Sequence, residues 1–132
     1  MSDLLKSIEN HEGFVGTVYK DSLGFETIGI GTKLPLTKFE ARMILESRLN
    51  AMIEEIKQKE PFYNKLPEKV KDIISEMAYQ LGVNGVLNFR KMWIALKLEN
   101  YVKASEEGLD SLWHTQTPRR AEELMYRLKS IN

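Results

Sequence analysis

The spacing of apolar residues changes twice in the first half of the chain. Over residues 3–12 apolar residues recur every four positions, with Glu12 on the same stripe and Gly13 as a stop, which predicts a short helix. Between residues 17 and 31 the period falls to two around the sequence "DSLG", which predicts a β-hairpin. The glycines of the second strand expose the backbone on the face that carries Thr27. After the hairpin the helical spacing returns.

Capping and breaking residues mark the ends of the later helices. In "LTKFE", Thr37 followed three residues on by Glu40 matches a capping box, so a long helix is expected over residues 38–60. Pro67 and Gly82 delimit a helix whose wide apolar face suits the centre of a bundle. Three further helices are expected over residues 86–98, 101–112 and 118–131.

Together these elements predict one α+β domain over residues 1–132. We expect a small hairpin lobe over residues 13–36, a linking helix over 38–60, and a helical lobe over 61–132 that includes the helix at 3–12. A chain of this length buries about two-thirds of its unfolded surface, which is enough for a hydrophobic core. A ligand is expected in a cleft between the two lobes.

Composition narrows the classes of partner. Hydrophobic residues form 42% of the chain and charged residues 29%, which is typical of a globular protein. The 19 basic residues balance the 19 acidic ones, so no overall field attracts nucleic acid or an anionic membrane. The chain has no cysteine, which excludes disulfides and thiolate chemistry, and no carboxylate–histidine cluster has ligand spacing, so no metal is expected. We find neither a signal-peptide core nor an apolar window long enough to span a bilayer.

Two acidic residues in the opening stretch suit acid–base catalysis. Glu12 continues an apolar stripe, where partial desolvation favours the protonated form of a carboxyl group. Asp21 lies at a turn near solvent, where a carboxylate stays ionised. Hydrolysis of a glycosidic bond needs such a pair, one group to protonate the leaving oxygen and one to activate water. A purely structural explanation stays open, because Asp is common in turns and Glu at helix ends.

Arg120 occupies an unusual position for a cation. With Thr117 as the cap and Pro118 in the first turn, Arg120 is the third helical residue and faces the positive end of the helix dipole. An anionic partner such as Glu12 would compensate this cost. The alternative is a solvated Arg at the helix surface, which costs only tenths of a kcal/mol, on the order of a weak surface interaction.

Three segments carry a resemblance to a known family: "HEGF" with "VYKDSLGFETIGIGT", "AYQLGVNGVLNF" and "LWHTQTPRRA". In this order they resemble the lysozymes of T-even bacteriophages, glycoside hydrolase family 24, over nearly the whole chain. The family motif is Glu, eight residues, Asp, five residues, Thr, and Glu12, Asp21 and Thr27 match it in identity and spacing.

The resemblance implies a lysozyme-like fold and a role for each matched residue. It implies that Glu12 is the general acid, that Asp21 positions or activates the water, and that Thr27 shares that water. Arg120 matches the arginine that pairs with the catalytic Glu. The family is regarded as inverting and needs no cofactor, so we expect none here.

We also expect Lys33, Tyr79 and Gln80 to bind substrate, the last two because the matching positions of the family face the cleft. The chain departs from the family in two ways. Thr32 stands where the family usually has His, and only residues 32–36 precede the helix cap, where the family carries a further strand and a short helix. One wall of the cleft is therefore expected to be cut down.

The resemblance implies a muramidase that cleaves the β-1,4 bond between N-acetylmuramic acid and N-acetylglucosamine, with a peptidoglycan glycan strand as its partner. We expect a monomer that binds no nucleic acid and does not insert stably into a membrane. It would accumulate in the host cytoplasm until a holin-dependent release system opens the way to the periplasm and cell wall, or act as a virion component. Two alternatives stay open: a homologue that binds glycan or protein without turnover, and a lytic transglycosylase.

Overall fold

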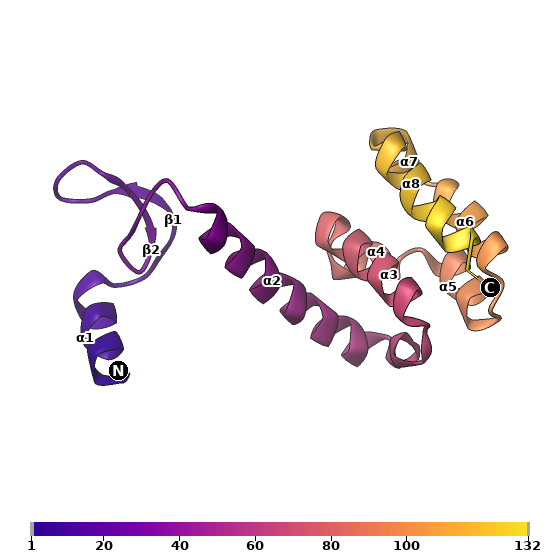
Figure 1. Ribbon diagram of the computed structural model, residues 1–132, viewed down its shortest axis with the longest axis horizontal. Helices are drawn as coiled ribbons and strands as arrows, with labels where there is room; N and C mark the ends of the chain where they lie inside the picture. Colours follow the sequence, from indigo (N-terminus) through magenta and orange to yellow (C-terminus); the bar gives the residue numbers. More distant parts are fainter. Residues whose placement is uncertain (1, 132) are drawn as a thin grey trace. The chain divides into compact units, whose positions relative to one another are not determined.

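The computed structural model describes residues 2–131 and divides into two compact units, with the boundary between Leu45 and Glu46. Along the chain a helix and a small antiparallel sheet come first, and all later elements are helical (Figure 1). This order confirms the predicted α+β class.

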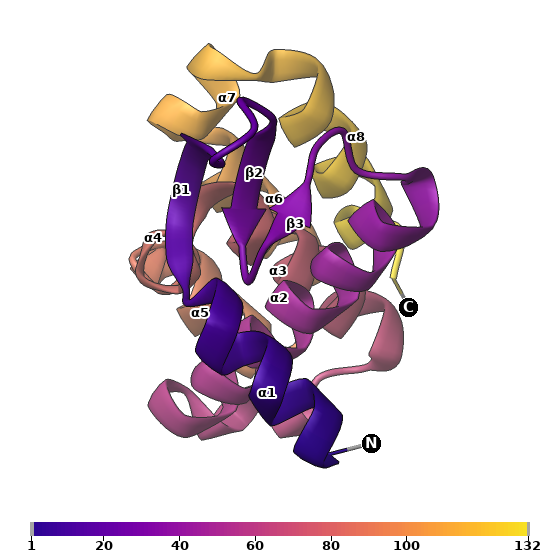
Figure 2. The ribbon, with the colours of Figure 1, turned by 90° about the vertical axis from the view of Figure 1, so that its left-hand side faces the viewer.

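The N-terminal unit consists of one helix, a three-stranded sheet and the start of a long helix. Its first elements are α1 (Ser2–Glu12), β1 (Val15–Lys20), β2 (Glu26–Gly29) and β3 (Thr32–Lys33). The strands lie side by side in the order β1-β2-β3, as Figure 2 shows. Thr27 in the central strand pairs with Tyr19 on one side and with Lys33 on the other. These three side chains therefore share one face of the sheet.

The third strand corrects an expectation from the sequence. The segment after the hairpin was expected to lack the further strand of the family, but Thr32 and Lys33 form β3 by pairing with Ile28 and Thr27. A strand of two residues is too short to show an alternating pattern, which explains why the sequence did not reveal it.

The long helix α2 (Lys38–Lys59) begins as its capping box predicts. The backbone N–H of Glu40 donates to Thr37 Oγ1 at 3.1 Å, and the backbone N–H of Thr37 donates to Glu40 Oε1 at 2.8 Å. These reciprocal bonds satisfy two donors that a helix start leaves without partners.

The C-terminal unit is helical and holds the hydrophobic core. After η1 (Pro61–Lys65) it contains α3 (Glu68–Leu81), α4 (Val83–Leu87), α5 (Arg90–Lys97), α6 (Tyr101–Leu109), α7 (Leu112–Gln116) and α8 (Pro118–Lys129). Six residues of α3 are buried, among them Val70, Ile74 and Met77, which confirms that this helix is central to the unit.

One predicted helix is divided in the structure, and another ends earlier than predicted. The helix expected over 86–98 breaks between α4 and α5, where Phe89 leaves helical geometry at φ −74° and ψ 62°. Its ring packs edge-on against Trp113, with centroids 5.9 Å apart. The helix expected over 101–112 ends at Leu109, and α7, which the sequence did not predict, begins after Ser111, whose hydroxyl accepts a hydrogen bond from the backbone N–H of His114 at 3.3 Å.

His114 in α7 links the end of α6 to the side of α8. Its Nδ1 lies 3.0 Å from the carbonyl oxygen of Leu109 in α6, and its Nε2 lies 2.7 Å from Oε2 of Glu122 in α8. A backbone carbonyl oxygen and an ionised carboxylate can accept hydrogen bonds but cannot donate them. A doubly protonated His114 ring has two N–H donors and so satisfies both oxygens at once. The hydrogen bond to Glu122 raises the pKa of His114 above its ordinary 6.5, and partial burial opposes this shift.

We expect the substitution Glu122→Ala to lower the Tm mainly at acidic pH. A group whose pKa is raised by folding stabilises the fold fully below its unfolded-state pKa, and this contribution is lost as the pH rises through the folded-state pKa. The Tm difference between the wild type and the variant should therefore be largest below pH 6.5 and shrink above it. Thermal unfolding between about pH 5 and 9 measures this difference.

The neighbouring Glu123 provides a matched control. It accepts a hydrogen bond from Arg127 Nη2 at 2.7 Å on the same helix. An Arg–Glu pair has no group that ordinarily titrates in this pH range, so the Tm difference caused by Glu123→Ala should be independent of pH. A Glu122→Ala difference that is equally flat contradicts a contribution from the protonated His114.

Candidate functional site

Four residues expected to act in the site belong to the N-terminal unit. Glu12 ends α1, Asp21 follows β1, Thr27 lies in the centre of β2, and Lys33 lies in β3. The structure brings Asp21 and Lys33 together, with 3.6 Å between Asp21 Oδ2 and Lys33 Nζ.

The two carboxylate oxygens of Asp21 have different surroundings. Oδ1 accepts hydrogen bonds from the backbone N–H groups of Leu23 at 3.0 Å and Phe25 at 2.8 Å, and so shapes the hairpin turn. Oδ2 is the oxygen that faces Lys33. A structural role of Asp21 in the turn therefore explains the bonds of Oδ1, whereas Oδ2 lies outside these turn bonds and is paired with Lys33.

These contacts keep Asp21 ionised. The hydrogen bond from the backbone N–H of Phe25 contributes most to lowering the pKa of Asp21 below its ordinary 3.8, and the Leu23 bond and the charge of Lys33 add to it. Partial desolvation opposes the shift, with 20% of the side chain exposed. An ionised carboxylate at this position suits a group that accepts a proton from water.

Thr27 is 1% exposed, the single buried residue that the structure describes in the N-terminal unit. Its hydroxyl donates to the backbone carbonyl of Phe25 at 2.8 Å. Because the one hydroxyl proton is used in this bond, the oxygen is left as an acceptor for a water molecule.

Glu12 lies at the end of α1, where the helix stops. The backbone N–H of Gly13 donates to Glu9 O at 2.8 Å, and Gly13 has a φ of +70°, a left-handed conformation that favours glycine. The Glu12 side chain is exposed, and its carboxyl group lies against the backbone of Gly31. Within the N-terminal unit α1 buries none of its residues, and the partial desolvation of Glu12 stays a prediction.

Arg120 has an anionic partner in its own unit. Its Nε donates to Glu76 Oε2 at 3.2 Å, across from α8 to α3, with 41% and 42% of the two side chains exposed. The sequence predicted a need for such a partner but did not indicate Glu76, because these residues are 44 positions apart and meet only through helix packing. The pairing of Arg120 with Glu12 stays a prediction.

Gln80 is held by two neighbours. Trp113 Nε1 donates to Gln80 Oε1 at 2.9 Å, and Gln80 Nε2 donates to Thr117 Oγ1 at 3.1 Å. Thr117 caps α8 without the side-chain bond expected of it, because its hydroxyl donates instead to Trp113 O at 3.2 Å. Tyr79 beside Gln80 is 40% exposed. The contacts of Lys33, Tyr79 and Gln80 with substrate stay predictions.

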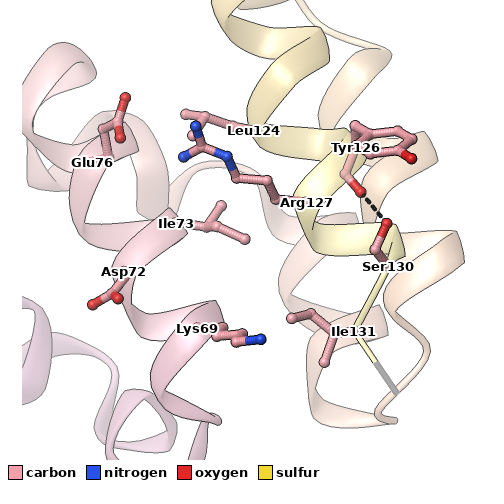
Figure 3. Close-up of a pocket in the computed structure, with 9 residues that line it drawn as sticks. All are labelled: Lys69, Asp72, Ile73, Glu76, Leu124, Tyr126, Arg127, Ser130 and Ile131. Carbon is pink, nitrogen blue, oxygen red and sulfur yellow. Dashed lines mark hydrogen bonds between the residues drawn. The ribbon is translucent and has the colours of Figure 1, made fainter.

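A pocket of about 430 Å³ lies between α3 and α8 (Figure 3). Ile73 on α3 and Leu124 on α8 give it apolar walls, and Arg127 extends from α8 toward α3 between them. None of the residues expected to act in catalysis or substrate binding lines it. We therefore assign it no part in the reaction.

Residues 2–131 contain no group of three or more His, Asp or Glu side chains that could hold a metal ion. None of the helices between Ser2 and Lys129 is long and apolar enough to cross a membrane.

Comparison with known proteins identifies the family. The model of the family described as phage lysozyme matches residues 9–129. The probable T4-type lysozyme 2 of Dictyostelium discoideum is 27% identical over 153 aligned positions, which cover 92% of this chain and 90% of that protein. The pre-baseplate central spike protein Gp5 of Enterobacteria phage T4 is 29% identical over 149 positions, which cover 89% of this chain and 26% of that protein.

The chain belongs to the phage lysozyme family. The resemblance noted in the sequence is thereby confirmed, and two T4-type lysozymes of Dictyostelium discoideum, at 27% and 25% identity, agree with it. Membership supports a lysozyme-like peptidoglycan hydrolase as the broad class of activity.

We expect Lys33→Met to raise the pKa of Asp21, because the substitution removes a nearby positive charge while the backbone hydrogen bonds remain. An NMR titration of the Asp21 side chain measures this change. Lys6→Met, in α1 of the same unit, removes a lysine that does not contribute to the low pKa and should leave the titration as it is. An unchanged Asp21 titration in Lys33→Met contradicts the ion pair.

Proposed function

We propose that the chain is a muramidase that hydrolyses the β-1,4 bond between N-acetylmuramic acid and N-acetylglucosamine in peptidoglycan. The observation that carries this proposal is the Asp21 carboxylate, which the hairpin keeps ionised through Oδ1 while Oδ2 faces Lys33 Nζ at 3.6 Å and is the oxygen proposed to act on water. The family match and the Glu12, Asp21 and Thr27 spacing support it.

In this reaction Glu12 protonates the oxygen of the leaving sugar, and Asp21 takes a proton from the attacking water. Thr27 Oγ1 is an acceptor because its own proton is donated to Phe25 O, and Asp21 Oδ2 is an acceptor because the carboxylate is ionised. A water molecule that donates one hydrogen to each has a lone pair left to attack the sugar carbon. The two acceptors thus orient the nucleophile as well as activate it.

Arg120 is proposed as the cation that pairs with Glu12. A guanidinium group has five N–H donors, so the bond from Nε to Glu76 leaves donors for a second carboxylate. Lys33, Tyr79 and Gln80 are proposed to bind the glycan strand. No cofactor takes part in the proposed mechanism.

The setting of the reaction is also part of the proposal. A monomeric enzyme would act on the cell wall after release from the host cytoplasm through a membrane pore. The similarity to a protein named as a central spike protein supports a second setting, within a virus particle.

We expect Glu12→Gln and Asp21→Asn each to reduce muralytic activity by about 10²-fold or more, the size expected from losing a general acid or base. Clearing of purified peptidoglycan suspensions measures the loss. Glu26→Gln changes an exposed acid in the same sheet and should retain nearly full activity.

Analysis of the products separates the proposal from its rivals. A hydrolase releases reducing sugars, and its activity requires Asp21. Release of 1,6-anhydro sugars, together with full activity of Asp21→Asn, indicates a lytic transglycosylase. Binding of peptidoglycan by the wild type with no products of either kind indicates a homologue without turnover.

A further inference from the structure

Gly29 and Gly31 lie two residues apart at the turn from β2 into β3. Their φ angles are +73° and +67°, both in the left-handed region that favours glycine. Backbone conformation alone would therefore explain a glycine at either position. The space around them is what distinguishes the two.

A side chain at position 31 would meet the acid directly. A Cβ built on Gly31 lies 2.5 Å from Oε2, 2.6 Å from Cδ and 2.8 Å from Cγ of Glu12. A Cβ built on Gly29 meets no atom within 4 Å. The end of the Glu12 side chain thus fills the volume that any other residue at position 31 would occupy.

We infer that Gly31 is a positioning residue for Glu12: the bare Cα of Gly31 is the surface on which the carboxyl group rests, and it sets the direction in which the acid presents its proton. This inference rests on the proposed role of Glu12 as general acid. Glu12 has three rotatable side-chain bonds at an exposed helix end, and α1 buries none of its residues. Contact with Gly31 is therefore a constraint that the packing of the helix itself does not supply.

The main test compares Gly31→Ala with Gly29→Ala. Both substitutions force L-alanine into the same strained backbone region, but only the first displaces the Glu12 carboxyl group. We expect kcat on soluble peptidoglycan fragments to fall about 10²-fold in Gly31→Ala with little change in KM, because small displacements of a catalytic group have effects of this size. Gly29→Ala should stay within a few-fold of the wild type. Equal losses in the two variants overturn the inference.

A stability cycle tests the contact without relying on activity. If the new methyl group meets Glu12, Gly31→Ala should lower the Tm less in a Glu12→Ala background than in the wild type. Gly29→Ala should lower the Tm equally in both backgrounds. An effect of Gly31→Ala that is the same in both backgrounds overturns the inference.

A third test uses the wild-type protein, so it does not depend on whether a variant folds. Protons on Gly31 Cα and Glu12 Cγ should show a nuclear Overhauser contact, and its absence overturns the inference. Failure of the proposed function gives a different set of results. Glu12→Gln would then keep the activity of the wild type, while the Overhauser contact and the stability coupling would still be observed.

Discussion

The hairpin turn and the proposed chemistry depend on the same carboxylate. Asp21 closes the turn by accepting two backbone hydrogen bonds on Oδ1, and these bonds are among the causes that keep the group ionised. Thr27 then follows on the central strand, where its hydroxyl donates a hydrogen bond to Phe25 O. A short segment with few buried residues can hold both side chains in place because its backbone supplies the donors and acceptors that they bond to.

Local signals predicted much of the fold. The capping box at Thr37 and Glu40 is formed as expected, and the wide apolar face of α3 is buried. The breaks near Phe89 and Ser111 were missed because apolar spacing continues across both. One break coincides with an aromatic contact to another helix, and the other depends on a serine cap that looks unremarkable in sequence. A two-residue strand carries no periodicity at all.

In the candidate site, too, local features could be predicted from sequence and contacts between distant residues could not. Glu12, Asp21 and Thr27 could be proposed from sequence because their spacing lies within one segment, and their catalytic roles stay predictions. The ion pair of Arg120 with Glu76 and the bonds of Gln80 to Trp113 join residues more than 30 positions apart, so they required the packing of the helical unit. Glu12 and Gly31 are closer in sequence than these pairs. Even so, a glycine in a turn does not reveal which atoms occupy the space that a side chain there would fill.

The bonds of Gln80 have a consequence for any molecule that reaches it. An amide group can ordinarily rotate by half a turn and exchange its oxygen and nitrogen, since the two ends have similar shape. An indole N–H can only donate, so Trp113 determines which end of the amide is oxygen. Gln80 therefore keeps a fixed polarity, and its second amide hydrogen suits a carbonyl or carboxylate on the approaching molecule rather than a group that can only donate.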